Sequence, residues 1–266
     1  MSTPSQDEIA ERGADHPASD VAGSVPDHPA PDVAGYYRAA AADIAGGGRD
    51  RPDEDGIWGG SLYDEADVEG LPADLVASSL GCGNPFALAE LHDGEIVVDL
   101  GSGAGLDVIL SARRVAPTGK AYGVDFLEEM RSQARANAAE AGVDNVEFLD
   151  GTLDAVPLGD ASVDVVISNC VLCLAEDKRP VFAEIARLLR DGGRVAVSDV
   201  VAADDAPVPD DPQAWAELGA GGLGQGQYVS ALEAAGFEHI SVEFTHQVAE
   251  GLHSASVRAV RVARSN

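Results

Sequence analysis

The stretch IVVDLGSGAGLDVIL, residues 96–110, decides the fold. Its first five residues are mostly branched and apolar, which is typical of a strand buried on both faces, as in a parallel sheet. Three glycines follow at the spacing G-x-G-x-G, and only glycine lets a backbone turn this tightly and approach a ligand without a Cβ in the way. Residues 106–115 are predicted to form a helix. A strand, a glycine turn and a helix start together indicate a nucleotide-type site.

The spacing of this turn favours a cofactor without a phosphate. A dinucleotide site uses G-x-G-x-x-G, whereas this turn closes one residue sooner and is preceded by Asp99. Taken alone, such a glycine pattern can also be a tight connection between a strand and a helix. The residues resemble the first motif of class I S-adenosylmethionine-dependent methyltransferases, in which the glycine turn packs against the methionine part of the cofactor.

Strands and helices alternate after the glycine turn, which predicts a parallel sheet wound on both faces. We expect further strands at 121–124, 146–149, 162–168, 194–201, 239–245 and 254–262, and helices at 86–91, 127–141, 178–190 and 228–235. The resemblance implies the doubly wound, seven-stranded, Rossmann-like α/β sheet of methyltransferases, whose last strand is antiparallel to the rest.

The cofactor contacts are expected where the strands end. Asp125 ends the second predicted strand, and an acidic side chain there can accept hydrogen bonds from both hydroxyls of a ribose. The resemblance places contacts to the adenine after the third strand. The residues expected to bind S-adenosylmethionine are Asp99, Gly101, Ser102, Gly103, Gly105, Asp125, Phe126, Met130, Thr152, Leu153 and Asn169.

The three cysteines are the other informative residues. Cys170 follows the fourth predicted strand, at the sheet edge where ligands of doubly wound folds bind, although a buried cysteine is often only a small hydrophobe. Cys82 lies between two glycines in a turn, which suits a ligand arm better than a core. Cys173 is expected to pack in the core. Cys82 and Cys170 are therefore the candidate catalytic residues.

Three segments resemble one family within the class I methyltransferases. SLGCGNP (79–85), VVDLGSG (97–103) and ISNCV (167–171) resemble the arsenite methyltransferases of archaea and bacteria, and the likeness covers residues 55–200. The resemblance implies that Cys82 and Cys170 are two of the ligands of trivalent arsenic, a soft and thiophilic substrate. The arsenic lone pair can attack the sulfonium methyl directly, so that no general base is needed.

The sequence departs from this family in its thiols. A third cysteine is usual after the fifth strand, but segment 218–226 holds none, and the family's more N-terminal cysteines are also absent. Either an external thiol, a hydroxide or Cys173 completes the arsenic ligands, or the enzyme takes another arsenical such as a monomethylated one, or another substrate.

Two alternatives to arsenic methylation follow. The first is a class I methyltransferase for another small molecule, such as a quinone, although such an acceptor would need a base and no histidine stands at a strand end near the site. The second is a non-catalytic metalloid- or cofactor-binding protein, which the intact glycine turn and Asp125 disfavour.

Composition limits the partners. The formal net charge is −29, from 46 acidic against 17 basic residues, which repels nucleic acid and anionic membranes. This excess along the whole chain predicts a surface adapted to high salt, typical of a halophilic archaeon, where screening removes the repulsion. The expected partners are a small trivalent arsenical and a thiol reductant, and the oligomeric state is left open.

An odd cysteine count, no secretory signal and no long apolar run predict a cytoplasmic protein with reduced thiols.

The chain of 266 residues fits one domain with appendages. Residues 1–35 are rich in Pro, Asp, Ser and Ala, contain an imperfect repeat and are expected to be disordered. Residues 36–92 are expected to form a helical and loop extension that carries Cys82. Residues 93–266 are expected to be the S-adenosylmethionine-dependent methyltransferase domain.

Overall fold

The computed structural model describes residues 56–175, 177–203 and 223–262, together with the helical residues 35, 38, 39 and 42. The expected tail therefore lies almost wholly outside the described residues, as does most of segment 36–55. The boundaries drawn after residues 35 and 92 stay predictions.

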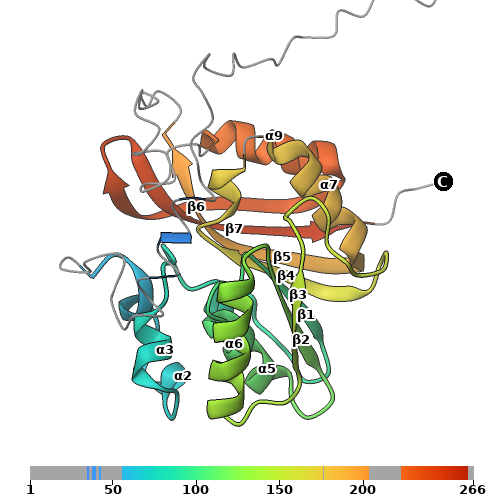
Figure 1. Cartoon of the computed structure of the whole chain (residues 1–266). Coiled ribbons are helices and arrows are strands. Elements are labelled where there is room, and N and C mark those ends of the chain that lie inside the picture. Colours follow the sequence, from blue (N-terminus) through green and yellow to red (C-terminus); the bar gives the residue numbers. More distant parts are fainter. Residues whose placement is uncertain are drawn as a thin grey trace, which may run out of the picture.

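A seven-stranded sheet forms the centre of the molecule, in the order β3-β2-β1-β4-β5-β7-β6 (Figure 1). Its strands are β1 (Ile96–Leu100), β2 (Lys120–Asp125), β3 (Val146–Asp150), β4 (Val163–Asn169), β5 (Leu189–Ala202), β6 (Phe237–Ala249) and β7 (Leu252–Arg261). The strands β1 to β5 pair in parallel, and β7 is antiparallel to both of its neighbours. The predicted sheet, with its antiparallel last strand, is confirmed.

Helices cover both faces of the sheet (Figure 1). The described helices are η2 (Gly59–Leu62), α2 (Glu65–Val68), α3 (Ala73–Ala77), α4 (Pro85–Leu88), α5 (Leu106–Val115), α6 (Glu128–Glu140), η3 (Leu172–Leu174), α7 (Lys178–Leu188) and α9 (Gln225–Ala235). In β1, Val97 packs in the apolar cluster that includes α5, whereas Val98 packs in the cluster that includes α7 and α9. Successive side chains of a strand point to opposite faces, so a continuous apolar run serves a sheet covered on both sides.

Several predicted bounds were wrong. Helix α7 ends at Leu188, two residues early, because Leu189 pairs with Val163 and begins β5 five residues before the predicted start. Strand β4 is shifted by one residue, and β6 is longer than predicted at both ends because it pairs with β7 along most of its length. The expected helix at 86–91 is the single turn α4. No described helix is long and apolar enough to cross a membrane.

Candidate active site

A cavity of about 230 Å³ opens at the carboxyl ends of β1, β2 and β4. All eleven residues predicted to bind the cofactor line this cavity, and so does Cys170. Cys82 does not line it, but its neighbour Gly81 does. The sequence-based prediction missed other parts of the wall. These include Ser78, Ser79, Leu80, Gly81, Ala104, Leu106, Asp107, Leu127, Val171, Leu174 and Ala175.

The glycine turn forms one wall and needs all three glycines. Gly101, Gly103 and Gly105 have φ angles of +75°, +50° and +89°, a region that side chains disfavour. A Cβ on Gly101 would lie 2.6 Å from a methyl of Val171, whereas a Cβ on Gly103 would meet nothing within 4 Å. Gly101 therefore allows close packing of the turn on the chain after β4, and Gly103 presents bare backbone.

Asp125 joins the end of β2 to this turn. Its Oδ2 accepts a hydrogen bond from the Gly103 N–H at 3.0 Å, and its Oδ1 accepts one from the Leu127 N–H at 2.9 Å. Burial raises the pKa of the Asp125 carboxyl, and these N–H groups oppose the rise. Each oxygen keeps a second lone pair, so the carboxylate can still accept hydrogen bonds from a ligand.

Two polar atoms of the cavity wall have no hydrogen-bond partner among the residues that the structure describes. They are Oδ1 of Asp99 and Oγ of Ser102, both buried. Burial, followed by the negative charges of Asp107 and Asp125, raises the pKa of Asp99 well above its usual range. A buried polar atom without a partner is costly, so this part of the wall is suited to a ligand that donates hydrogen bonds or carries a positive charge.

A hydrogen-bond network behind the cavity connects Tyr63, Asp107 and Asn169. The Tyr63 hydroxyl donates to the two Asp107 oxygens at 2.8 and 2.9 Å, and Asn169 Nδ2 lies 3.2 Å from Asp107 Oδ2. Burial raises the pKa of Asp107 to about 6, although both hydrogen bonds oppose the rise. Asp107 could have been found from the sequence, because it is an acidic residue within the apolar run of α5. Nothing in the sequence pointed to Tyr63, 44 residues earlier.

The three cysteines gather in one buried cluster with Trp58, Val200 and Leu252. All three are free thiols. Cys170 has a φ of +60°, a conformation that is strained for a residue with a side chain. Its N–H donates to the Ser198 carbonyl of β5 at 2.8 Å, which fixes the backbone at the cavity wall.

The turn that carries Cys82 is tightly packed, and the positions on both sides of the cysteine leave no space for a side chain. A Cβ on Gly81 would lie 2.2 Å from Nδ2 of Asn169, and one on Gly83 would lie 2.5 Å from Oγ of Ser198. The Cys82 carbonyl accepts a hydrogen bond from Ser254 Oγ at 2.7 Å. The Gly-Cys-Gly sequence is therefore a packing requirement. The expectation that this turn suits a ligand arm better than a core is wrong for the structure, because the Cys82 thiol is fully buried in an apolar cluster.

Cys173 is buried, as the sequence predicted, but it has polar surroundings. A hydrogen bond with Cys170 comes first among the causes that raise the pKa of Cys173 well above its usual range, followed by burial and by the nearby Asp199. The Cys173 N–H donates to Asp199 Oδ1 at 3.1 Å, and the Tyr228 hydroxyl donates to Oδ2 at 3.3 Å. Among the described residues, no three His, Cys, Asp or Glu side chains converge closely enough to hold a metal ion.

Known proteins share this architecture. A family model described as a methyltransferase domain matches residues 91–236. An arsenite methyltransferase from Halobacterium salinarum is 42% identical over 84% of this chain and 61% of its own length. Another arsenite methyltransferase, from Aquipseudomonas alcaligenes, is 39% identical over 48% of this chain and 39% of its own. The chain thus spans less than two thirds of these curated relatives.

Solved structures agree with the sequence comparisons. An arsenic(III) S-adenosylmethionine methyltransferase from Chlamydomonas reinhardtii matches with a TM-score of 0.64 and 28% identity, over 76% of this chain and 74% of that one. A phosphoethanolamine N-methyltransferase from Haemonchus contortus, in complex with S-adenosyl-L-methionine, matches with a TM-score of 0.60 and 16% identity, over 69% and 54%, which shows the fold alone. These matches confirm the resemblance that the sequence motifs indicated. Because the domain model covers more than half of the chain, the chain belongs to the methyltransferase domain family.

Proposed function

We propose that the protein transfers a methyl group from S-adenosylmethionine to trivalent arsenic held by the thiolates of Cys82 and Cys170. The observation that supports this most strongly is that Cys170 lines the cavity next to the glycine turn and also shares a buried cluster with Cys82. A soft electron-pair acceptor such as trivalent arsenic prefers sulfur ligands. The names of the curated relatives agree with this substrate.

The cavity fits S-adenosylmethionine. Asp99 has an unpartnered carboxylate oxygen for an ammonium group, Asp125 has free lone pairs for ribose hydroxyls, and Gly103 allows close approach. The carboxyls of Asp99, Asp107 and Asp125 at the cavity wall favour a positively charged ligand. When bound, S-adenosylmethionine supplies a methyl group on a positively charged sulfur.

Arsenite and the cysteines react without any redox change. Each thiol replaces one hydroxide of arsenite, so that an As–S bond forms, an As–O bond breaks, and the thiol proton leaves in the released water. The lone pair on arsenic is then the nucleophile, and no proton has to be removed from it. An As–C bond would form as the C–S bond of the sulfonium breaks and S-adenosylhomocysteine leaves, and the arsenic, formally oxidised from As(III) to As(V), would be reduced again by the thiol reductant. The role of the protein is to hold arsenic in line with the methyl group and its leaving sulfur.

The third position on arsenic is not assigned to a protein residue. An external thiol, a hydroxide or the methyl group of a monomethylated arsenical can fill it, and Cys173 is the nearest further thiol because it is hydrogen-bonded to Cys170. A thiol reductant would supply the external ligand. Segment 218–226, where the family's third cysteine would be expected, lies mostly outside the described residues and contains no cysteine.

The decisive experiment uses the purified protein in high salt with S-adenosylmethionine and a thiol. Arsenite and methylarsenite are supplied in parallel, and methylated products are separated by chromatography and identified by mass spectrometry. Product from either arsenical is the expected result, and a preference for methylarsenite would match the missing third cysteine. Failure with both, while calorimetry shows that the cofactor binds, would contradict the proposal.

The same experiment tests the proposal against the two alternatives raised from the sequence, a different methyl acceptor and a protein that only binds. The cavity wall holds no histidine among the described residues, but Asp107, with its pKa of about 6, is placed there and could act as a base. The sequence argument that an oxygen acceptor would find no base is therefore weaker than expected. Another methyl acceptor, or a protein that only binds, is the conclusion if no methylated arsenic forms.

A further inference from the structure

We infer that Asn169 is a positioning residue whose side chain clamps the turn carrying Cys82 onto the carboxyl end of β4, so that the Cys82 thiol is held beside the cofactor cavity. Sequence reasoning had assigned Asn169 to cofactor binding. The inference deepens the proposed function and rests on it in one respect, because it takes Cys82 as a ligand of arsenic. The clamp itself is a property of the protein and can be tested without arsenic.

Both ends of the Asn169 amide hold the turn. Its Oδ1 accepts hydrogen bonds from the N–H groups of Cys82 at 3.1 Å and Gly83 at 3.3 Å. Its Nδ2 donates to the Gly83 carbonyl at 2.9 Å. These contacts join positions 86 and 87 residues apart in the chain. Among side chains of this size only an amide can both accept from N–H groups and donate to a carbonyl, so neither Asp nor Leu can replace it.

The orientation of the amide is fixed by the groups behind it. Nδ2 also lies 3.1 Å from the Tyr63 hydroxyl and 3.2 Å from Asp107 Oδ2. A carboxylate only accepts hydrogen bonds, so Asp107 holds the NH₂ group of the amide on its own side. The oxygen is then directed to the N–H groups of the turn. The Tyr63 hydroxyl, which donates to both Asp107 oxygens, keeps the carboxylate in place.

The turn is held on its other side by β7, through the hydrogen bond from Ser254 to the Cys82 carbonyl. Only the Asn169 side of the turn faces the cofactor cavity, since Asn169 and Gly81 line it and Ser254 does not. Loss of the Asn169 contacts would therefore free the turn on the side where the reaction takes place. The cavity contacts of Asp99, Asp125 and the glycine turn would stay intact.

The test compares Asn169→Asp with Asn145→Asp. Asn145 is a matched control because its amide, like that of Asn169, holds backbone of another segment: it donates to the carbonyls of Ala112 at 2.8 Å and Gly119 at 3.1 Å, away from the cavity. The first readout is the rate at which a thiol reagent alkylates each cysteine of the folded protein, measured by mass spectrometry. In Asn169→Asp, we expect the reagent to alkylate Cys82 at least about tenfold faster than in wild type, because hydrogen bonds that hold the turn against β4 are lost. Asn145→Asp should leave this rate unchanged.

The second readout is arsenite binding, followed by the fluorescence of Trp58. Trp58 packs in the cluster with the three cysteines, and Trp215→Phe in every variant removes the other tryptophan. Arsenite affinity should fall at least about tenfold in Asn169→Asp, while the affinity for S-adenosylmethionine, measured by calorimetry, should fall by no more than about threefold, because an added carboxyl does not disfavour a cation. A residue that bound the cofactor directly would show the reverse pattern.

Tyr63→Phe is the second variant and covers the case in which Asn169→Asp does not fold. It removes the hydroxyl that orients Asp107 but keeps the direct contacts of Asn169 with the turn, so Cys82 alkylation should accelerate by a smaller factor. Wild-type alkylation rates at Cys82 in both variants would overturn the inference, and so would equal acceleration in Asn145→Asp. If wild type itself binds no arsenite while Asn169→Asp still accelerates alkylation, the proposed function fails and the clamp stands.

Discussion

Cys170 is the residue on which the proposed chemistry depends most directly. It combines a strained backbone, a place in the cavity wall and contact with the other thiols. We expect Cys170→Ser to abolish arsenic methylation, because oxygen is a poor ligand for a soft metalloid. Cofactor affinity measured by calorimetry should change by less than about twofold. Cys173→Ser is the companion variant, and it should retain activity when an external thiol is supplied. A Cys170→Ser enzyme as active as wild type would exclude the thiol mechanism.

Asp125 is the residue on which cofactor affinity should depend most. Asp125→Ala removes the contact proposed for the ribose hydroxyls and also the hydrogen bonds from the Gly103 and Leu127 N–H groups. The binding free energy of S-adenosylmethionine should therefore weaken by about 1.5 to 3 kcal/mol, the range for hydrogen bonds to a charged group. Isothermal titration calorimetry measures this change. Unchanged affinity would remove Asp125 from the site.

Asp199 should give the protein a measurable pH dependence of stability. Burial raises its pKa to about 6, above the value in an unfolded chain, although hydrogen bonds oppose the rise. The native state then binds the proton more tightly than the unfolded state, so this group lowers the free energy of unfolding as the pH rises from about 4 to about 6. The free energy of unfolding of Asp199→Asn should not show this fall. Its difference from the wild-type value should therefore change in favour of the variant by about 1 to 3 kcal/mol as the pH rises from 4.5 to 7. Urea unfolding at both pH values measures the difference, and identical pH profiles would contradict it.

The residues that sequence reasoning found and missed differ in one physical respect. The glycines, Asp99 and Asp125 follow from one strand and the turns next to it, so their pattern is local and readable. The partners of Cys82 are not local, because Asn169 and Ser254 lie 87 and 172 residues away in the chain. No spacing rule connects them, since only the order of the strands brings them together.

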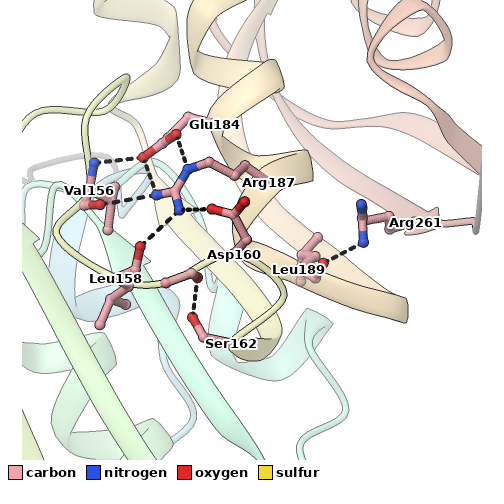
Figure 2. Close-up of polar contacts among 9 residues, drawn as sticks. Val156, Leu158, Asp160, Ser162, Glu184, Arg187, Leu189 and Arg261 are labelled. Carbon is pink, nitrogen blue, oxygen red and sulfur yellow. Dashed lines mark hydrogen bonds and ion pairs between the residues drawn. The ribbon is translucent and has the colours of Figure 1, made fainter.

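The loop between β3 and β4 is held by several contacts to one arginine side chain. Arg187 of α7 donates to the carbonyls of Val156 and Leu158 and pairs with Glu184 and Asp160 (Figure 2). The planar guanidinium reaches all four at once, which an ammonium cannot do. The loop begins with Gly151, Thr152 and Leu153, and all three line the cavity. Arg187 of α7 therefore holds in place a loop that forms part of the cavity wall.

We expect Arg187→Lys to lower the free energy of unfolding by about 1 to 3 kcal/mol and to weaken cofactor binding several-fold. Thermal unfolding and calorimetry provide the two measurements. Arg190→Lys is the control. Arg190 lies in the same region, forms an ion pair with Asp164 and donates a hydrogen bond to the Ser162 carbonyl, but its side chain is half exposed. If both variants had the same small effect, the loop would not depend on Arg187.

Among the elements, helix α5 was predicted with its exact bounds, whereas β5 and β6 were not. Helix α5 begins directly after Gly105 and carries a periodic apolar face, both of which are local signals. The start of β5 is set by the pairing of Leu189 with Val163, and the length of β6 by its pairing with β7. Strand ends depend on the partner strand, and its register is not visible in the sequence of the strand itself.

The charge of the whole molecule should make its stability depend on salt. The formal net charge of −29 repels itself at low ionic strength, and too few basic residues are present to neutralise it. The melting temperature should therefore rise from dilute buffer to about 2 M potassium chloride, because the Debye length falls to a few ångströms. A melting curve in low salt equal to that in high salt would contradict a salt-adapted surface. The similarity to a Halobacterium protein agrees with the prediction.

The hydrogen bond between Ser254 and Cys82 has a consequence for how the protein is made. The glycine turn, the ends of β1, β2 and β4 and most of the cavity wall are complete once the ribosome has released the chain as far as residue 175. The anchor of the Cys82 turn on β7 is translated much later. A nascent or prematurely ended chain could thus form most of its cofactor pocket while its thiol turn still lacks that anchor, so the proposed thiol site would be the last part of the cavity region to be completed.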